Sequence, residues 1–324
     1  MKDFTLHVVC PNPALDHLQV VEQFTPYEVN RVAEVTSLPG GKGLIVARVA
    51  RRAGASVAVY GFVGGPTGEI IREGTVALGA ADRHVTVGGS TRITPVVIDL
   101  ATGRSTVLNE LGPTITQPEL ERCLALVESQ VQPGDVVVST GSLPPGVPVD
   151  FHATIASLAL RCGAWVIIDA QGEALAAVLD WARASGASDR VIIKPNAKEL
   201  GDLLGRELVG VDAVFEVIHE QRDAIAATYV VTMGADGAIW SSPETEFVVD
   251  SPRVDLVNAT GSGDSFLAGL AVELGRPGSP ESAMRLGSAM GAANAMNVVP
   301  DVDPEVVAKL LELVRVTPGE VTRS

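Results

Sequence analysis

The sequence lacks the features that would tie it to a membrane, to a disulfide framework or to a nucleic acid. No run approaches the roughly 18 uninterrupted apolar residues that a membrane-spanning helix needs. Only three cysteines occur, Cys10, Cys123 and Cys162, and the absence of CxxC spacing favours reduced thiols over disulfides or a zinc site. Basic residues are in deficit, because 24 Lys and Arg against 39 Asp and Glu give a net charge of −15. That charge repels nucleic acids and anionic membranes, so neither is an expected partner.

Signal-peptide and common nucleotide-binding patterns are also missing. Residues 1–13 contain neither an apolar core nor a small-residue cleavage site, so we expect a cytoplasmic protein. No GxxxxGK[ST] loop occurs, and the first apolar run continues into Pro11–Asp16 where a dinucleotide-binding domain would have GxGxxG. The sequence therefore argues against both a P-loop enzyme and a dinucleotide-binding domain.

The arrangement of apolar residues predicts an α/β fold. Short Val- and Ile-rich runs, most of them apolar throughout, alternate with longer Ala- and Leu-rich segments of helical periodicity. Strands are expected at Leu6–Cys10, Val57–Val63, Asp135–Thr140, Trp165–Asp169, Val191–Lys194 and Tyr229–Thr232. Helices are expected at 43–53, 66–79, 117–130, 148–162, 172–185, 211–226, 262–274, 279–296 and 303–315. This alternation indicates a mostly parallel central sheet with helices on both faces, whose ligands bind at the carboxyl ends of the strands.

Two segments interrupt the alternation, at about residues 16–38 and 90–111. Their apolar residues are mixed with polar ones, as in extended and half-exposed strands. We expect them to form a small sheet that stands off the main body as a lid, although two surface hairpins would give the same pattern. The chain shows no linker, so we expect a single domain over residues 1–324 with this lid attached.

A glycine-rich turn in front of a predicted helix carries the strongest chemical signal. Gly261, Ser262 and Gly263 would present unpaired backbone N–H groups at the positive end of the helix dipole, which suits a phosphate group. Asp264 lies in the first helical turn, where a carboxylate can accept the proton of an attacking hydroxyl group or bind a metal ion. The alternative is structural, because Ser and Asp are also good helix N-caps.

Two further polar segments contain lysine. In residues 38–43, LPGGKG, glycines precede a helix and Lys42, which allows close approach of a polar small molecule or forms a flexible turn. In KPNAKE an apolar strand ends at Lys194, and Asn196 and Glu199 have the spacing of a helix capping box. Glu199 could instead hold water molecules of a Mg²⁺ ion, which usually keeps most of its waters.

Two more polar turns follow predicted strands, at residues 139–146 and 232–237. Because the carboxyl ends of parallel strands meet at one edge of a sheet, we expect all five polar segments to converge there. Together these segments resemble the pfkB (ribokinase-like) family of carbohydrate kinases. GGKGLIVARVARRAGASVAVYGFVGG resembles the first signature of the family, DLVNATGSGDSFLAG the second, and KPNAKEL its N-x-x-E magnesium motif.

Other segments resemble one branch of that family. NPALD, STGSLPPGVP, DAQGEAL and NELGP are similar to the kinases of sugar phosphates, including 1-phosphofructokinase and tagatose-6-phosphate kinase. The resemblance implies a three-layer αβα sandwich with a small β-sheet lid. It also implies an ATP- and Mg²⁺-dependent phosphotransferase acting on a hydroxyl group of fructose 1-phosphate, fructose 6-phosphate or tagatose 6-phosphate.

The resemblance also implies roles for individual residues. Asp264 would be the base that accepts the hydroxyl proton, and Gly261–Gly263 would form the anion hole for the transferring phosphoryl group. Acceptor binding is implied for Asp16, Gly40, Gly41, Lys42, Arg92 and Ser142, the last two on the phosphate group that the acceptor already carries. Nucleotide binding is implied for Lys194, Asn196, Thr232, Gly234 and Gly237. Glu199 would hold Mg²⁺ through water.

Two positions depart from the family pattern and leave the acceptor open. Ile45 and Thr94 stand where the family commonly has asparagine. The alternatives are therefore a ribokinase-like kinase of an unphosphorylated sugar or nucleoside, and a non-catalytic sensor of sugar phosphates. We also expect a homodimer that forms through the lid, because the edges of a small exposed sheet need cover.

Overall fold

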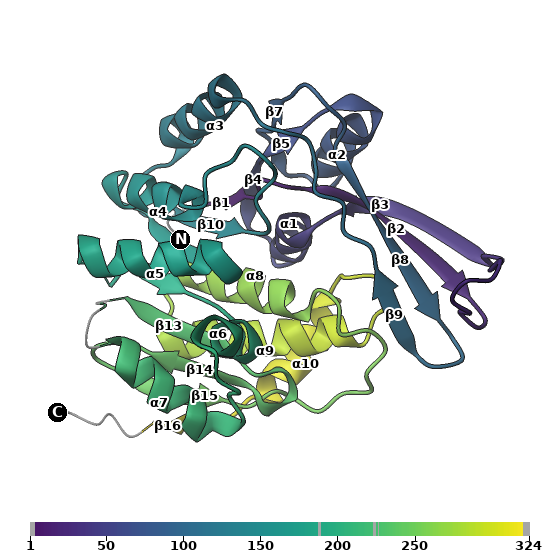
Figure 1. Cartoon of the computed structure of the whole chain (residues 1–324). Coiled ribbons are helices and arrows are strands. Elements are labelled where there is room, and N and C mark those ends of the chain that lie inside the picture. The colour runs from purple at the N-terminus through teal and green to yellow at the C-terminus, as the bar shows by residue number, and fades with distance from the viewer. Residues whose placement is uncertain (1–3, 187–188, 223–224, 226, 320–324) are drawn as a thin grey trace.

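A ten-stranded sheet forms the centre of the protein, which is described by a computed structural model over residues 4–186, 189–222, 225 and 227–319 (Figure 1). The strand order is β16-β15-β14-β13-β12-β11-β10-β1-β4-β6. From β6 to β13 all neighbouring strands are parallel, and β14 to β16 continue the sheet in antiparallel pairs. The strands are β1 (Thr5–Val9), β4 (Ser56–Tyr60), β6 (Ala81–Asp82), β10 (Val136–Thr140), β11 (Trp165–Asp169), β12 (Val191–Ile193), β13 (Thr228–Thr232), β14 (Ala238–Ser241), β15 (Glu246–Val249) and β16 (Val316–Pro318).

Helices cover both faces of this sheet. They are α1 (Lys42–Arg52), α2 (Gly65–Ala77), α3 (Gln117–Gln130), α4 (Phe151–Arg161), α5 (Gly172–Ser185), α6 (Ala197–Leu204), α7 (Gly210–Arg222), α8 (Ser262–Gly275), α9 (Pro280–Ala295) and α10 (Pro304–Leu313). The nine expected helices are confirmed, except that residues 223, 224 and 226 at the end of the expected helix 211–226 lie outside the described residues. The helix α6, for which only a capping box was noted, lies between two of them.

The hydrophobic core has two halves, one on each face of the sheet. Alternate strand residues such as Val9 and Ile168 belong to the half that includes α3, α4, α5 and α7, whereas Val8 and Ile167 belong to the half that includes α1, α8, α9 and α10. Side chains alternate between the two faces of a strand, so a strand covered on both faces must be apolar throughout. This explains why the central strands read as continuous Val and Ile runs, and the expected mostly parallel sheet is confirmed.

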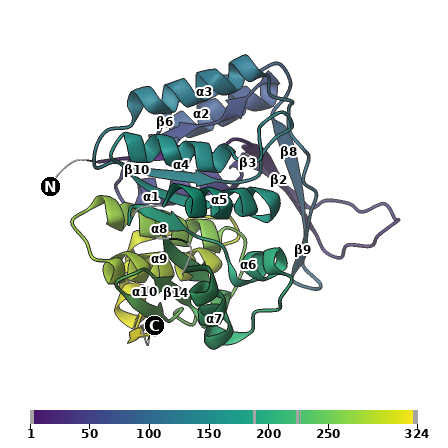
Figure 2. The same ribbon diagram turned by 60° about the vertical axis from the view of Figure 1, so that its left-hand side comes forward.

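A separate four-stranded sheet extends from one side of the body (Figures 1 and 2). It consists of β2 (Ala14–Val21), β3 (Glu34–Gly40), β8 (Arg92–Asp99) and β9 (Arg104–Val107), in the order β3-β2-β8-β9. Its strands come from the two segments that interrupt the alternation of the sequence, so the expected small sheet is confirmed. A third, two-stranded sheet pairs β5 (Phe62–Val63) with β7 (Val85–Thr86).

The antiparallel edge of the main sheet was not expected from the sequence. Strands β14, β15 and β16 are only three or four residues long, too short to show a periodicity. In the part of the chain described here, no helix has the length and apolar character needed to cross a membrane.

Candidate active site

Gly261 forms the turn that leads into α8. It is the N-cap residue of this helix and has a φ of 80°, a conformation that favours glycine. A β-carbon at this position would lie 2.8 Å from Cβ of Pro300 and 3.3 Å from Cδ1 of Ile45. The turn therefore depends on glycine for both its backbone angle and its close packing.

The backbone N–H groups at this turn are only partly free. Those of Gly261, Gly263 and Asp264 donate to no acceptor among the described residues, and a β-carbon at Gly263 would meet only open space. The Ser262 N–H, which we expected to be free, instead donates to the carbonyl oxygen of Ala259 at 3.2 Å. The free N–H groups still provide a cradle for an anion at the positive end of α8.

Asp264 is buried at the start of α8, with 8 % of its surface exposed. Burial is the main cause that raises its pKa to about 7, and the carboxylates of Asp169 and Glu199 add to the rise. The ammonium groups of Lys42 and Lys194 oppose it. Near neutral pH this carboxyl group can therefore exist in both the protonated and the ionised form, as a proton acceptor requires.

Lys42 connects the first glycine-rich segment to the carboxylates. Its Nζ donates to Oδ2 of Asp169 at 3.2 Å and lies 3.7 Å from Oε1 of Glu199. Burial alone would lower the pKa of Lys42, but the carboxylates of Asp169, Asp264 and Glu199 raise it above its usual value. Lys42 is therefore cationic throughout the physiological pH range.

Asp169, which sequence reasoning did not assign, lies at the centre of this charged cluster. It accepts hydrogen bonds from Lys42 and from Oγ1 of Thr140 at 2.9 Å, and its Oδ1 lies 3.8 Å from Nζ of Lys194. Burial opposes ionisation, yet Lys194 and Lys42 lower the pKa of Asp169 below its usual value. A signal was available, because Asp169 ends the apolar strand β11 at the carboxyl edge of the sheet.

The segment around Asn196 forms the capping box that its spacing indicates. The Asn196 side chain accepts from the Glu199 N–H at 2.8 Å, and Glu199 Oε2 accepts from the Asn196 N–H at 2.9 Å. Asn196 also forms an isolated parallel bridge with Thr232 at the end of β13. Lys194, Asn196 and Thr232 therefore lie together, at the carboxyl ends of neighbouring strands.

The turn after Thr232 has glycines at the positions that require them. Gly234 has a φ of 62° and Gly237 a φ of 90°. A β-carbon at Gly237 would lie 2.0 Å from the carbonyl oxygen of Val249, whereas one at Gly234 would meet nothing within 4 Å. Gly237 is thus needed for packing, and Gly234 leaves backbone open for contact with a ligand.

The oxygen donors of the cluster fit a Mg²⁺ ion that is held mainly by water and by phosphate groups. Among the described residues no group of three or more His, Cys, Asp or Glu could enclose a metal ion. Glu199 Oε1 accepts from no backbone N–H group of the described residues and lies 3.7 Å from Nζ of Lys42. One carboxylate with water molecules between it and the ion is the arrangement that Mg²⁺ commonly uses with nucleotides.

On the side of the small sheet, Asp16 faces the glycines of the first segment. Its Oδ2 accepts the Gly41 N–H at 3.4 Å, and a β-carbon at Gly40 would lie 1.9 Å from the same oxygen. Burial is the main cause that raises the pKa of Asp16 to about 6, while Gly41, Arg92 and Arg48 oppose the rise. Asp16 has no strong partner among the residues that the structure describes and is available to bind a hydroxyl group.

Arg92 and Ser142 come together through Asn12, another residue that the sequence analysis did not assign. Arg92 Nε donates to the carbonyl oxygen of Asn12 at 3.2 Å, and Asn12 Nδ2 donates to Ser142 Oγ at 3.1 Å. The neighbouring Thr94 is buried on the same small sheet, and its hydroxyl group has no partner among the described residues. These contacts join β8 of the small sheet to the loop after β10.

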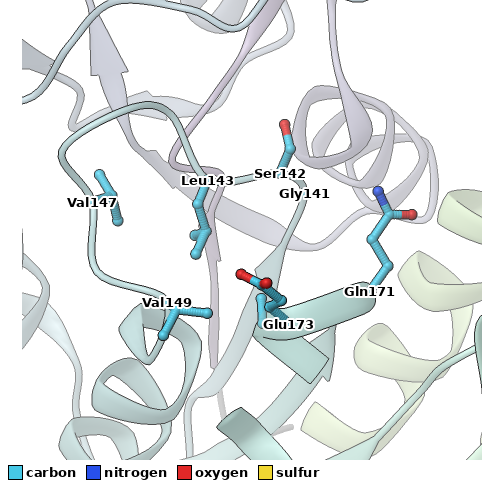
Figure 3. Close-up of a pocket in the computed structure, with 8 residues that line it drawn as sticks. Gly141, Ser142, Leu143, Val147, Val149, Gln171 and Glu173 are labelled. Atoms are coloured by element: carbon cyan, nitrogen blue, oxygen red, sulfur yellow. The ribbon is translucent and has the colours of Figure 1, made fainter. Parts of the chain in front are cut away.

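A cavity of about 370 Å³ lies beside Ser142. Its walls are the loop after β10 and the start of α5, as Figure 3 shows. The lining residues are Gly141, Ser142, Leu143, Val147, Val149, Gln171, Glu173 and Ala174. Of the residues expected at the site, only Ser142 lines this cavity, so the cavity does not coincide with the charged cluster.

Two buried residues link the small-sheet side to the start of α8. Arg48, which is 8 % exposed, donates to the carbonyl oxygens of Pro39 at 2.9 Å and of Pro300 at 2.7 Å. Burial raises the pKa of the Cys10 thiol, and its electrostatic partners include both Arg92 and Asp264. The expected residues on the small-sheet side and those at the charged cluster therefore face one region of the protein.

Comparisons with a family model and with known proteins agree on one family. A family model described as pfkB family carbohydrate kinase matches residues 11–298. The 1-phosphofructokinase of Bacillus subtilis (strain 168) is 33% identical to this chain over 312 residues, which cover 96% of the chain and 99% of the relative.

Solved structures agree with this match. Phosphofructokinase-2 from Escherichia coli, in a tetrameric inhibited form, is 28% identical with a TM-score of 0.86, over 96% of this chain and 99% of that chain. Its complex with fructose 6-phosphate is also 28% identical with the same coverage, and its TM-score is 0.85. Ribokinase from Thermotoga maritima, 20% identical over 95% of this chain and 99% of that chain, has a TM-score of 0.74 and shares the fold.

The raised pKa of Asp264 can be tested through the pH dependence of the free energy of unfolding. The pKa of an aspartate has a reference value of 3.8, and that of Asp264 in the folded protein is about 7. Between these values the unfolded chain releases the proton and the folded protein keeps it, so the free energy of unfolding decreases as the pH rises from about 4 to 7. We expect Asp264→Asn to remove this loss and to raise the free energy of unfolding at pH 8, by at most about 4 kcal/mol. Urea denaturation at pH 5 and pH 8 measures the difference.

Asp82 is the matched control with the opposite sign. Burial opposes ionisation there, but hydrogen bonds from His84 and Arg72 lower the pKa of Asp82 to about 2. Its contribution is present above pH 3.8 and is lost as the pH falls through 2, so Asp82→Asn should destabilise the protein at both test pH values. An equal effect of Asp264→Asn at pH 5 and pH 8 would contradict the account of Asp264.

Proposed function

Because the chain belongs to the pfkB family of carbohydrate kinases, we propose that it transfers the γ-phosphoryl group of ATP to a hydroxyl group of a hexose phosphate. The observation that carries this proposal is the position of Asp264. It is a buried carboxyl group with a pKa of about 7, beside free N–H groups at the start of α8 and within electrostatic reach of two lysines. A proton acceptor, an anion cradle and positive charge are the three components that phosphoryl transfer needs.

The hexose phosphate is proposed from the relatives and from the small-sheet side of the site. One relative is a 1-phosphofructokinase, and the Escherichia coli enzyme has been solved with fructose 6-phosphate. In this chain Arg92 and Ser142 lie together and can bind a phosphate group, while Asp16 is available for a sugar hydroxyl. Fructose 1-phosphate, fructose 6-phosphate and tagatose 6-phosphate are the acceptors to test.

The proposed reaction is an in-line displacement at the γ-phosphorus. The acceptor hydroxyl gives its proton to a carboxylate oxygen of Asp264, and its oxygen forms a bond to phosphorus while the bond to the β-phosphate oxygen breaks and ADP leaves. The N–H groups of Gly261 and Gly263 bind the equatorial oxygens of the phosphoryl group, and Lys42 compensates their charge. Lys194, Asn196, Thr232 and the backbone at Gly234 would hold the nucleotide.

Glu199 is proposed to bind a Mg²⁺ ion through water molecules. Glu199 would hold this ion near the phosphate groups, where its positive charge would reduce the repulsion between ATP and the carboxylates of the cluster. Asn196 fixes the Glu199 side chain through the capping box, so its second oxygen remains directed toward the cluster.

A specific observation favours one alternative acceptor. Ile45 is 5% exposed, and its Cδ1 would lie 3.3 Å from a β-carbon at Gly261, so the Ile45 side chain offers no hydrogen bond at this wall of the site. A ribokinase-like kinase of an unphosphorylated sugar or nucleoside is therefore the second candidate. Turnover of the three hexose phosphates and of their unphosphorylated parents distinguishes the two functions. A non-catalytic sensor is the outcome only if no acceptor supports ATP turnover.

We expect Asp264→Asn to lower kcat by about 10²–10⁴-fold while ATP still binds, because the amide cannot accept the hydroxyl proton. In the wild type, kcat/KM should fall as the pH decreases through about 7, because Asp264 becomes protonated. Steady-state kinetics with the best acceptor and calorimetry with ATP measure both effects. Near-normal turnover of the variant would refute the proposed role of Asp264.

Arg92→Ala tests the binding of the acceptor phosphate. The guanidinium group of Arg92 is proposed to make charged hydrogen bonds to this phosphate, so its loss should raise the KM of the hexose phosphate about 10- to 100-fold. The KM of ATP should change less than about threefold, because ATP binds at the other side of the cluster. Arg104→Ala, at an exposed position of β9, is the matched control. Equal effects of Arg92→Ala on both substrates would overturn the assignment.

We further propose that the protein works in a reducing, cytoplasmic compartment as a homodimer that forms through the small sheet, which acts as a lid. Val35, Val107 and Leu108 on or beside this sheet are 56%, 43% and 59% exposed. Apolar side chains beside free strand edges favour pairing with a second copy. Light scattering should give the mass of a dimer, and Val35→Glu with Val107→Glu should give monomers; a monomeric wild type would contradict this proposal.

A further inference from the structure

Asn12 is almost completely buried between the two groups proposed to bind the acceptor phosphate. Only 4% of its surface is exposed, and it follows β1 at the carboxyl edge of the main sheet. Its backbone carbonyl oxygen accepts from Nε of Arg92, and its side-chain NH₂ donates to Ser142. Asn12 is therefore the residue that joins Arg92 of the small sheet to Ser142 of the main body.

The orientation of the Asn12 amide follows from its surroundings. One partner is the carbonyl oxygen of Leu111, at 3.1 Å, and a carbonyl oxygen can only accept a hydrogen bond. The atom that faces Leu111 must therefore be Nδ2. The same nitrogen lies 3.1 Å from Oγ of Ser142, so both of its hydrogens are used.

This orientation fixes the direction of the hydrogen bond at Ser142. The Asn12 NH₂ can only donate, so Ser142 Oγ must be the acceptor, and the Ser142 proton remains available for another partner. In Figure 3 the Ser142 hydroxyl group points away from the side of the cavity where Glu173 lies. No acceptor for this proton occurs among the described residues.

Arg92 is restrained in a similar way. Its Nε donates to Asn12, and its Nη1 lies 3.4 Å from Oδ1 of Asn109 and from the carbonyl oxygen of Glu110. Its Nη2 has no acceptor among the described residues. Nη2 of Arg92 and the hydroxyl group of Ser142 thus both have hydrogens to donate and are both held by Asn12.

We propose that Asn12 is a positioning residue that makes the phosphate subsite a set of donors only. This inference rests on the proposed function and deepens it, because such a subsite selects a phosphate monoester, whose oxygens only accept, over a hydroxyl group, which also donates. The Asn12 side chain acts through Ser142, its backbone carbonyl oxygen holds Arg92, and Asn12 does not itself bind the acceptor. In the described part of the chain Oδ1 of Asn12 has no hydrogen-bond partner, as expected when the NH₂ end decides the orientation of the amide.

A double-mutant cycle with Asn12→Ala and Ser142→Ala tests the inference. Calorimetry measures the Kd of the hexose phosphate, and kinetics measures the KM of ATP. Each single variant should raise the Kd about tenfold, the loss of one hydrogen bond to a charged group. The double variant should be no worse than about threefold beyond either single one, because Asn12 acts through Ser142.

Two further variants separate positioning from a general structural role. Asn12→Asp replaces the donor by a carboxylate that accepts the Ser142 proton, so it should bind the hexose phosphate more weakly than Asn12→Ala. Asn297→Ala is the matched control, because the NH₂ group of Asn297 likewise donates two hydrogen bonds, in its case to the carbonyl oxygens of Ala293 and Asp301. It should leave the Kd of the hexose phosphate within about twofold of the wild type.

The outcomes separate this inference from the proposed function. A wild type that binds and phosphorylates a hexose phosphate, with additive effects of Asn12→Ala and Ser142→Ala, overturns the role of Asn12 and leaves the proposed function intact. The role is also overturned if Asn12→Ala raises the KM of ATP as much as the Kd of the acceptor. A wild type that binds no hexose phosphate overturns both.

Discussion

The charge balance of the site depends on one buried carboxylate, that of Asp169. It pairs with Lys42 and Lys194, and without such a counter-ion the buried ammonium group of Lys194 would destabilise the fold by several kcal/mol. When all three carboxyl groups are ionised, the two lysines and the three carboxylates of the cluster have a summed charge of 2 − 3 = −1. The one carboxylate in excess therefore takes up a proton most readily. The burial and position of Asp264 make it that group, with a pKa of about 7. A chain with a net charge of −15 can thus hold two lysines where polyphosphate is proposed to bind.

The chemistry and the stability of this site oppose each other. An ionised Asp264 is unfavourable where it lies, and Gly261 accepts a left-handed backbone to place it there. Arg48 stabilises this arrangement through two hydrogen bonds. It donates to the carbonyl oxygen of Pro39, next to the first glycine-rich segment, and to that of Pro300, which packs against Gly261. Such buried polar groups are retained in proteins where they position reactive groups, at the expense of stability.

Much of the fold could be predicted from the sequence, because parallel strands covered on both faces are apolar throughout and the helices between them are long. The glycine-rich turns could also be predicted, because each of them follows a predicted strand or precedes a predicted helix. The contacts of Asp169, Arg48 and Asn12 could not, because they join residues 127, 252 and 130 positions apart. A pattern shows which residue types are present, and it does not show which distant neighbour satisfies a hydrogen bond. The hydrogen bond from the Ser262 N–H to the carbonyl oxygen of Ala259 was not predicted, because it depends on the backbone conformation of the turn and not on the residue types.

The central claim is that the carboxyl group of Asp264 shares one region with the donor nucleotide and the acceptor alcohol. A crystal structure with a hexose phosphate and a non-hydrolysable ATP analogue tests this most directly. The account predicts a carboxylate oxygen of Asp264 about 2.6–3.2 Å from the acceptor hydroxyl, with that hydroxyl in line with the γ-phosphorus. A hydroxyl group bound out of reach of Asp264, with another side chain as its hydrogen-bond acceptor, would contradict it.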